Sequence, residues 1–225
     1  MGAGFVVLGR QSAEQLAGRL AGRGHNVALV RDGPDHSQFV TDFGMKQIPN
    51  GFEVGCQLTD PLAASRAIGQ AVDAVDTIRA FVHVVASPPE GKPLIGMSRE
   101  SWIATVDEVW RAIAVGGAIA QHKPAGPVSL MIVMDADDRA CPANRVPAST
   151  VAEALRSLIK SLARQLGPQE LRVVGLATRL RHAQLSEHLT IPEEDVEAIE
   201  TLANSALMPM TGTTVMLDHG EWMAS

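Results

Sequence analysis

Short apolar runs alternate with longer amphipathic stretches along the chain, and this alternation constrains the fold more than any other feature of the sequence. Such a pattern is typical of strand–helix units arranged around a parallel sheet. We expect residues 31–50 to form a polar loop, and Thr150 with Glu153 to form a capping box. The predicted strands are residues 5–8, 26–30, 52–58, 80–85, 128–134, 171–176 and 213–217, and the predicted helices are residues 12–23, 61–75, 98–121, 150–166 and 192–207.

The fold predicted from this pattern is α/β. We expect a Rossmann-like, doubly wound parallel sheet of about seven strands with helices on both faces. A chain of 225 residues that is 46% apolar and 20% charged is large enough to bury one full core. The sequence has no internal repeat and no low-complexity linker, so residues 1–225 are predicted to form a single domain.

Charge and cysteine content exclude several classes of function. The net charge of −6 disfavours binding to nucleic acid or to an anionic membrane, because both partners need an excess of Lys and Arg. The N-terminus shows no signal-peptide pattern, and no apolar run approaches the roughly 20 residues of a membrane span. The two cysteines, Cys56 and Cys141, form no framework or metal cluster, and Cys141 is interpreted as an inert thiol. A cytoplasmic protein is expected.

Several segments resemble the short-chain dehydrogenase/reductase (SDR) family over almost the whole chain. Residues 19–27 are similar to the family's first helix and second strand, and residues 161–173 are similar to its fifth helix and sixth strand. Residues 211–220 resemble the closing strand, with His219 where the family usually has glycine. The order and spacing of these segments imply a dehydrogenase scaffold.

The same register puts unusual residues where the family binds its dinucleotide. Gly9 opens the turn after the first strand, and this turn is about two residues shorter than the family's Gly-rich turn. The family's other two glycine positions hold Gln11 and Ala13 here. Because backbone N–H groups of that turn must approach a pyrophosphate, we expect these side chains to obstruct it. Gln57 replaces an acidic residue that holds adenine, and Ala86 ends the segment that replaces an Asn-Asn-Ala-Gly turn. The resemblance therefore implies that no cofactor is bound.

The catalytic positions are replaced as well. The family's Tyr-x-x-x-Lys pair maps to Ala148 and Ala152, and its serine maps near Asp135, or to Met134 if the register shifts by one residue. The chain contains no tyrosine, so no shift of register restores one, and Lys160 lies two turns beyond the expected lysine. A positioned acid–base group contributes about 10²–10⁴-fold to a rate, and groups that act as a unit fail together. Hydride transfer by this chain alone is not expected.

Other polar residues are interpreted as structural. Asp135, Asp137 and Asp138 form an acidic cluster that we expect to be a solvated loop, because no histidine lies at ligand spacing, and no metal site is predicted. His83 is expected to be a core histidine whose nitrogens bond to neighbouring backbone. Residues 178–179 replace the Pro-Gly pair that contacts nicotinamide in the family. Arg179 of this pair is expected at the surface.

The leading interpretation is a non-catalytic subunit that pairs with an active SDR paralogue in a hetero-oligomer, most simply a heterotetramer. The family commonly assembles through helices that map to residues 98–121 and 150–166 and through the last strand, residues 213–217, and these segments are retained. The pattern of loss is similar to two-subunit NAD(P)-dependent hydroxyacyl-CoA dehydrogenases in which one subunit resembles an inactive homologue. Two alternatives stay open: an enzyme of cofactor-independent chemistry that uses Asp135 or His83, and a small-ligand sensor.

The prediction of an interface rests on the width of the apolar surface of the two helices. A helix covered on two sides needs more than one apolar stripe. The extra apolar residues expected to face a partner are Ala152, Ala154, Ile159 and Ala163 of the fifth helix, and Trp110, Ala114 and Ile119 of the fourth.

Overall fold

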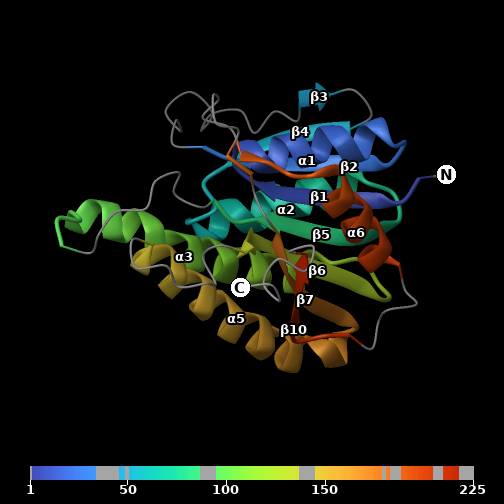
Figure 1. Cartoon of the computed structure of the whole chain (residues 1–225). Coiled ribbons are helices and arrows are strands. Elements are labelled where there is room, and N and C mark those ends of the chain that lie inside the picture. The colour runs from blue at the N-terminus through green and yellow to red at the C-terminus, as the bar shows by residue number, and fades with distance from the viewer. Residues whose placement is uncertain are drawn as a thin grey trace.

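The computed structural model is organised around one large sheet with helices on both faces (Figure 1). The strand order is β10-β7-β6-β5-β1-β2-β4-β3, and all pairings are parallel except that of β3 with β4. This order confirms the predicted doubly wound sheet. The residues described are 2–33, 46–48, 51–86, 95–136, 145–178, 181–182, 189–204 and 210–217.

The strands follow the apolar runs of the sequence. In chain order they are β1 (Gly4–Gly9), β2 (Asn26–Asp32), β3 (Lys46–Ile48), β4 (Gly51–Cys56), β5 (Ile78–Val84), β6 (Val128–Asp135), β7 (Leu171–Thr178) and β10 (Thr213–Leu217). Strands β8 (Arg181–His182) and β9 (Leu189–Thr190) form a separate antiparallel pair. The helices are α1 (Gln11–Gly22), α2 (Pro61–Ala74), α3 (Arg99–His122), α5 (Val146–Leu166) and α6 (Glu193–Ala203), with a 3₁₀ turn at Gly167–Gln169.

The sheet separates two apolar cores because side chains alternate along each strand. On β1, Val6 and Leu8 point into the core covered by α2, α3 and α5, whereas Phe5 and Val7 point into the core covered by α1 and α6. Both faces of the central strands are therefore buried, as expected for a parallel sheet. Among the helices that the structure describes, none is long and apolar enough to cross a bilayer.

Three local predictions were wrong. Part of the predicted loop at residues 31–50 forms β3, which pairs antiparallel with β4. Helix α5 begins four residues early, at Val146, where Pro147 occupies the first turn, so Thr150 donates a hydrogen bond to the Val146 carbonyl instead of capping the helix. Helix α6 ends at Ala203, before the predicted limit at residue 207.

The carboxyl ends of β1 and β5 lie side by side at the centre of the sheet. The chain runs from β1 to β2 on one side of this point, while β5, β6 and β7 follow on the other side. Such a switch point is where doubly wound sheets bind ligands, in the crevice beyond the strand ends. The candidate site is therefore formed by the β1–α1 turn and the ends of β2, β5 and β6.

Candidate functional site

The β1–α1 turn is very short. Gly9 ends β1 and Gln11 begins α1, so Arg10 alone connects them. Gly9 has φ +140°, and a Cβ there would lie 2.6 Å from the carbonyl oxygen of Val84. The glycine is thus required by the close approach of β5. The turn between β1 and α1 is thus a single residue long.

An ion-pair network of the chain's own side chains occupies this edge of the sheet. The buried Asp32 carboxylate, at the end of β2, accepts hydrogen bonds from Arg10 Nε at 3.1 Å and from Arg111 Nε at 2.8 Å. Its other oxygen accepts from the backbone N–H of Leu58 at 3.0 Å. Burial alone raises the pKa of Asp32, but the Leu58 N–H and the two guanidinium groups outweigh it and hold that pKa below its ordinary value.

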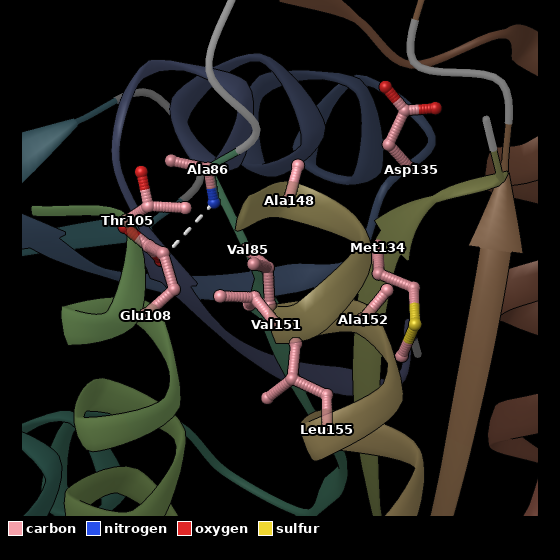
Figure 2. Close-up of a pocket in the computed structure, with 10 residues that line it drawn as sticks. All are labelled: Val85, Ala86, Thr105, Glu108, Met134, Asp135, Ala148, Val151, Ala152 and Leu155. Carbon is pink, nitrogen blue, oxygen red and sulfur yellow. Dashed lines mark hydrogen bonds between the residues drawn. The ribbon is translucent and has the colours of Figure 1, made fainter. Parts of the chain in front are cut away.

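Glu108 of α3 extends the network to β5. Its carboxylate accepts from Arg111 Nη1 at 3.0 Å and from the backbone N–H of Ala86 at 3.3 Å, a bond that Figure 2 shows as a dashed line. Arg10 Nη1 lies 3.9 Å from the same carboxylate. Burial raises the pKa of Glu108, and the two arginines offset this only in part. Asp32, Glu108, Arg10 and Arg111, called the cleft network below, balance two negative with two positive charges.

The residues at this edge do not fit a dinucleotide held in the usual way. The acid at the end of β2 would hydrogen-bond a ribose hydroxyl, but here Asp32 accepts from three groups of the protein. Gln11 and Gln57 are exposed, whereas Ala13 is fully buried in the core with α1 and α6. The expectation that the Ala13 side chain obstructs the phosphate is therefore wrong, because Ala13 packs beneath the turn and it is Arg10 that reaches across the crevice.

The predicted catalytic positions do come together, around a small pocket (Figure 2). Ala148 and Ala152, at the start of α5, face the ends of β5 and β6. Glu108 and Asp135 approach from opposite sides, one from α3 and one from β6 (Figure 2). The space open to the centre of a water molecule is about 10 Å³, which is room for about one water. The lining residues are Val85, Ala86, Thr105, Glu108, Met134, Asp135, Ala148, Val151, Ala152 and Leu155.

Asp135 is buried and is not part of a solvated loop. Its Oδ2 lies 3.5 Å from Arg145 Nη2, just before α5. The other acidic residues of the predicted cluster, Asp137 and Asp138, and also Cys141 and Arg179, lie outside the described residues. In the part of the chain that the structure covers, no group of three or more His, Cys, Asp or Glu side chains could hold a metal ion.

His83 is buried on β5, 1% exposed, as expected for a core histidine. The backbone of Leu8 is the polar group beside the ring, although neither ring nitrogen meets it with full hydrogen-bond geometry. Burial is the main reason that the pKa of His83 is lowered to about 4; Arg111 acts in the same direction, and Asp32 and the Leu8 backbone oppose both. The ring is therefore neutral at pH 7 and adjoins the cleft network.

Comparison with protein-family models gives a match to the enoyl-(acyl carrier protein) reductase family over residues 10–206. The chain belongs to this family of short-chain dehydrogenases/reductases. Comparison with curated protein sequences gave no match.

Solved SDR structures share the fold over nearly the whole chain. A 3-ketoacyl-(acyl-carrier-protein) reductase from Brucella melitensis complexed with NADH is 17% identical, with a TM-score of 0.78 and coverage of 97% of this chain and 98% of that one. A Pseudomonas aeruginosa short-chain oxidoreductase containing an atypical catalytic center is 15% identical, with a TM-score of 0.75 and coverage of 97% and 96%. A putative oxidoreductase from Escherichia coli is also 15% identical, with a TM-score of 0.75 and coverage of 100% and 99%.

The sequence analysis missed the cleft network. Glu108 and Arg111 are three residues apart on a face of α3 that is otherwise apolar and buried, which is an unusual place for charges. That pairing was a usable signal of a buried ion pair. Arg10 carried a weaker signal, since a cation directly after the first glycine is informative only once its acidic partner is known.

The network should stabilise the fold unequally through its two arginines. We expect Arg111→Ala to lower the free energy of unfolding by about 3–5 kcal/mol, because it leaves buried carboxylates without their main partner. Arg10→Ala should cost about 0–1 kcal/mol, because the Arg10 side chain is 48% exposed. Urea denaturation of both variants, with Arg156→Ala at the exposed Glu153 pair as control, measures the difference. Equal effects of Arg111→Ala and Arg156→Ala would contradict this account.

His83 should make stability depend on pH. Its folded pKa of about 4 lies below the ordinary value of 6.5, so the unfolded chain binds more protons between these values. The free energy of unfolding should therefore fall by about 3 kcal/mol as pH is lowered from 6.5 to 4. Glu108 acts in the opposite direction, because its raised pKa makes the folded chain bind more protons.

The His83 contribution is isolated by subtracting the urea-derived pH profile of His83→Leu from that of the wild type. The Glu108 contribution is common to both proteins and cancels. His122→Leu, at a half-buried histidine bonded to Ser65, serves as the matched control for removal of a histidine. A His83→Leu profile parallel to that of the wild type would show that His83 does not resist protonation.

Proposed function

We propose that this chain is a non-catalytic subunit that supports an active SDR paralogue in an NAD(P)-dependent dehydrogenase of the hydroxyacyl-CoA type. The observation that carries the proposal is the cleft network, in which the chain's own charges bond to one another at the edge where the fold binds dinucleotides. The adjoining pocket offers alanine at both positions of the family's Tyr–Lys pair and has room for about one water. Neither feature suits hydride transfer.

An exposed apolar face supports the presence of a partner. Helix α3 projects beyond the sheet at its first turns (Figure 1). Its solvent side carries a stripe of large apolar residues at a spacing of three and four, the pattern of a helix that packs against another helix. Trp110 at the centre is 61% exposed. The α3 stripe consists of Ile103, Val106, Trp110 and Ile113.

The part of the interface predicted on α5 is corrected. Ile159 is fully buried within the subunit, and its Cδ1 would lie 2.7 Å from a Cβ built at Gly175 of β7. Ala152 and Ala163 are buried as well. These three residues thus serve the subunit's own core, whereas Ala154 is half-buried, and the main apolar contact with a partner is assigned to α3. On α3, Ala114 and Ile119 are also buried, whereas Trp110 is exposed as predicted.

A cofactor-independent enzyme is the second candidate, and Glu108 is the observation in its favour. Its carboxyl lines the small pocket, and burial raises its pKa, which is a feature of general acids and bases. Both carboxylate oxygens are nevertheless bonded within the protein, one to Arg111 and one to Ala86. Because these partners hold the carboxylate within the cleft network, the subunit proposal is preferred.

The purified chain should not bind NADH or NADPH. Calorimetric titration is expected to show no saturable heat up to millimolar dinucleotide, because Asp32 already accepts hydrogen bonds from Arg10, Arg111 and Leu58 where a ribose hydroxyl would donate. The double variant Ala148→Tyr, Ala152→Lys should also show no hydride transfer, since a tyrosine does not fit the space beside Ala148. A micromolar dissociation constant, or turnover by the double variant, would contradict the proposal.

The α3 stripe should hold the paralogue. A tagged chain returned to its own host should co-purify with one SDR protein identified by mass spectrometry, and Trp110→Glu should release it without changing the circular dichroism spectrum. Leu62→Glu is the matched control, because Leu62 is 70% exposed on α2, away from the stripe. If Trp110→Glu keeps the paralogue bound, the stripe is not the interface.

A further inference from the structure

The buried side of α3 changes character at Glu108. Each side chain of residues 99–107, called the outer part of α3 below, is half-buried or exposed. Glu108 and Arg111, 4% and 8% exposed, are therefore the first buried side chains of the helix. Beyond them the buried side is apolar and packs into the core. The apolar residues that anchor this C-terminal part are Ala112, Ala114, Val115, Ala118 and Ile119.

The two charged residues tie α3 to the carboxyl edge of the sheet. Arg111 Nε donates to Asp32, at the end of β2, at 2.8 Å. The Glu108 carboxylate accepts from the backbone N–H of Ala86, just beyond β5, at 3.3 Å, and from Arg111 Nη1 at 3.0 Å. At the point where its apolar anchor ends, α3 is thus held by hydrogen bonds to two different strands.

The outer part of α3 has side-chain hydrogen bonds only within the helix and its cap. Ser98 caps the helix by accepting from the Ser101 N–H at 3.1 Å, and the Thr105 hydroxyl donates to the Ser101 carbonyl at 3.0 Å. These bonds support the helix but do not fix its direction relative to the sheet. A helical segment this short is marginally stable in water by itself. The outer part therefore depends on the turn that carries Glu108 and Arg111.

Stability alone does not require charges at this place. Well-packed apolar side chains in place of a buried ion pair are often neutral or stabilising. Hydrogen bonds between charged groups differ from apolar contacts because they are directional. The planar Arg111 guanidinium reaches two carboxylates at once, Asp32 through Nε and Glu108 through Nη1. This fork fixes the rotation of α3 about its own axis more strictly than apolar packing does.

The same part of the helix carries the centre of the α3 stripe. Trp110 stands next to Arg111 in the chain, and Val106 precedes Glu108 by two residues, but Trp110 and Val106 lie on the exposed side. A helix turns by about 100° per residue and moves as one body over such a short distance. A rotation that releases Arg111 from Asp32 therefore turns Trp110 by the same angle.

We infer that Glu108 and Arg111 are positioning residues for the subunit interface. Through the cleft network they hold the outer part of α3 in the orientation in which the α3 stripe meets the partner subunit. This inference rests on the proposed function, which supplies the partner. Because coupling between two sites is reciprocal, a partner bound to the stripe should in turn stabilise the cleft network.

The test removes the network contacts of α3 without leaving a buried charge unpaired. Glu108→Leu combined with Arg111→Met keeps the net charge of the chain. Asp32 stays bonded to Arg10 and to the Leu58 N–H, so the fold should be retained. Circular dichroism and urea denaturation check that it is.

Hydrogen exchange on the free chain, followed by mass spectrometry, measures the freedom of the outer part. Peptides from residues 103–111 should exchange roughly tenfold faster in the double variant than in the wild type. A hydrogen bond to a charged group contributes about this factor to a local opening equilibrium. Peptides from residues 112–122 should exchange as in the wild type, because their apolar anchor is unchanged.

The double variant should also lose the co-purified paralogue, although every residue of the α3 stripe is kept. Glu153→Leu combined with Arg156→Met is the matched control, because these residues form an ion pair of the same spacing, at 2.8 Å, on the exposed side of α5. The control should change neither the exchange of α3 nor the amount of paralogue.

Arg111→Lys replaces the double variant if that variant does not fold. Lysine keeps the charge, but a single ammonium group does not reproduce the guanidinium fork between Asp32 and Glu108. Faster exchange of residues 103–111 and less paralogue are expected here as well.

Wild-type exchange in the outer part of α3, or an undiminished amount of paralogue, would overturn the inference and leave the proposed interface in place. If the wild type itself retains no paralogue, the proposed function fails instead, so the two failures are distinguishable.

Discussion

The carboxylate of Asp32 is the point on which the carboxyl edge of this sheet depends. It receives Arg111 from α3, Arg10 from the β1–α1 turn and the Leu58 N–H from the β4–α2 turn, so one buried anion joins three segments to β2. An anion in an apolar core is tolerated only when its partners replace the lost water. The elements that the SDR fold opens toward a cofactor are here held to one another.

The chain keeps the SDR scaffold, while polar groups at its carboxyl edge bond to one another in the cleft network. Folding of a parallel sheet requires apolar strands, tight turns and packed helices, and all of these follow the SDR pattern over residues 10–206. Binding of a dinucleotide uses donors and acceptors at the strand ends, and several of those groups here bond to one another in the cleft network. The scaffold is retained together with the α3 stripe, through which an assembly is proposed to form.

The sequence predicted the strands well for one physical reason. Apolar runs and helix periodicity are local signals, and the register of the family resemblance placed Ala148, Ala152 and Asp135 around one pocket, as observed. The features that the sequence did not predict depend on contacts between segments that are distant in the chain. Asp32 lies 22 residues from Arg10 and 79 residues from Arg111, so neither of these two pairs is visible in a local pattern. Ile159 was misassigned because burial against β7 and burial against a partner need the same residue type.

The most direct test of this account is hydrogen exchange at the backbone amides of Leu58 and Ala86, measured by NMR with and without millimolar NADH. The account predicts that both amides are protected, because they donate to the carboxylates of Asp32 and Glu108, that NADH leaves this protection unchanged, and that Asp32→Asn weakens it at Leu58. Exchange of both amides near the rate of an unfolded chain, or a change in protection on addition of NADH, would contradict the claim that the cleft is held closed by the chain's own charges.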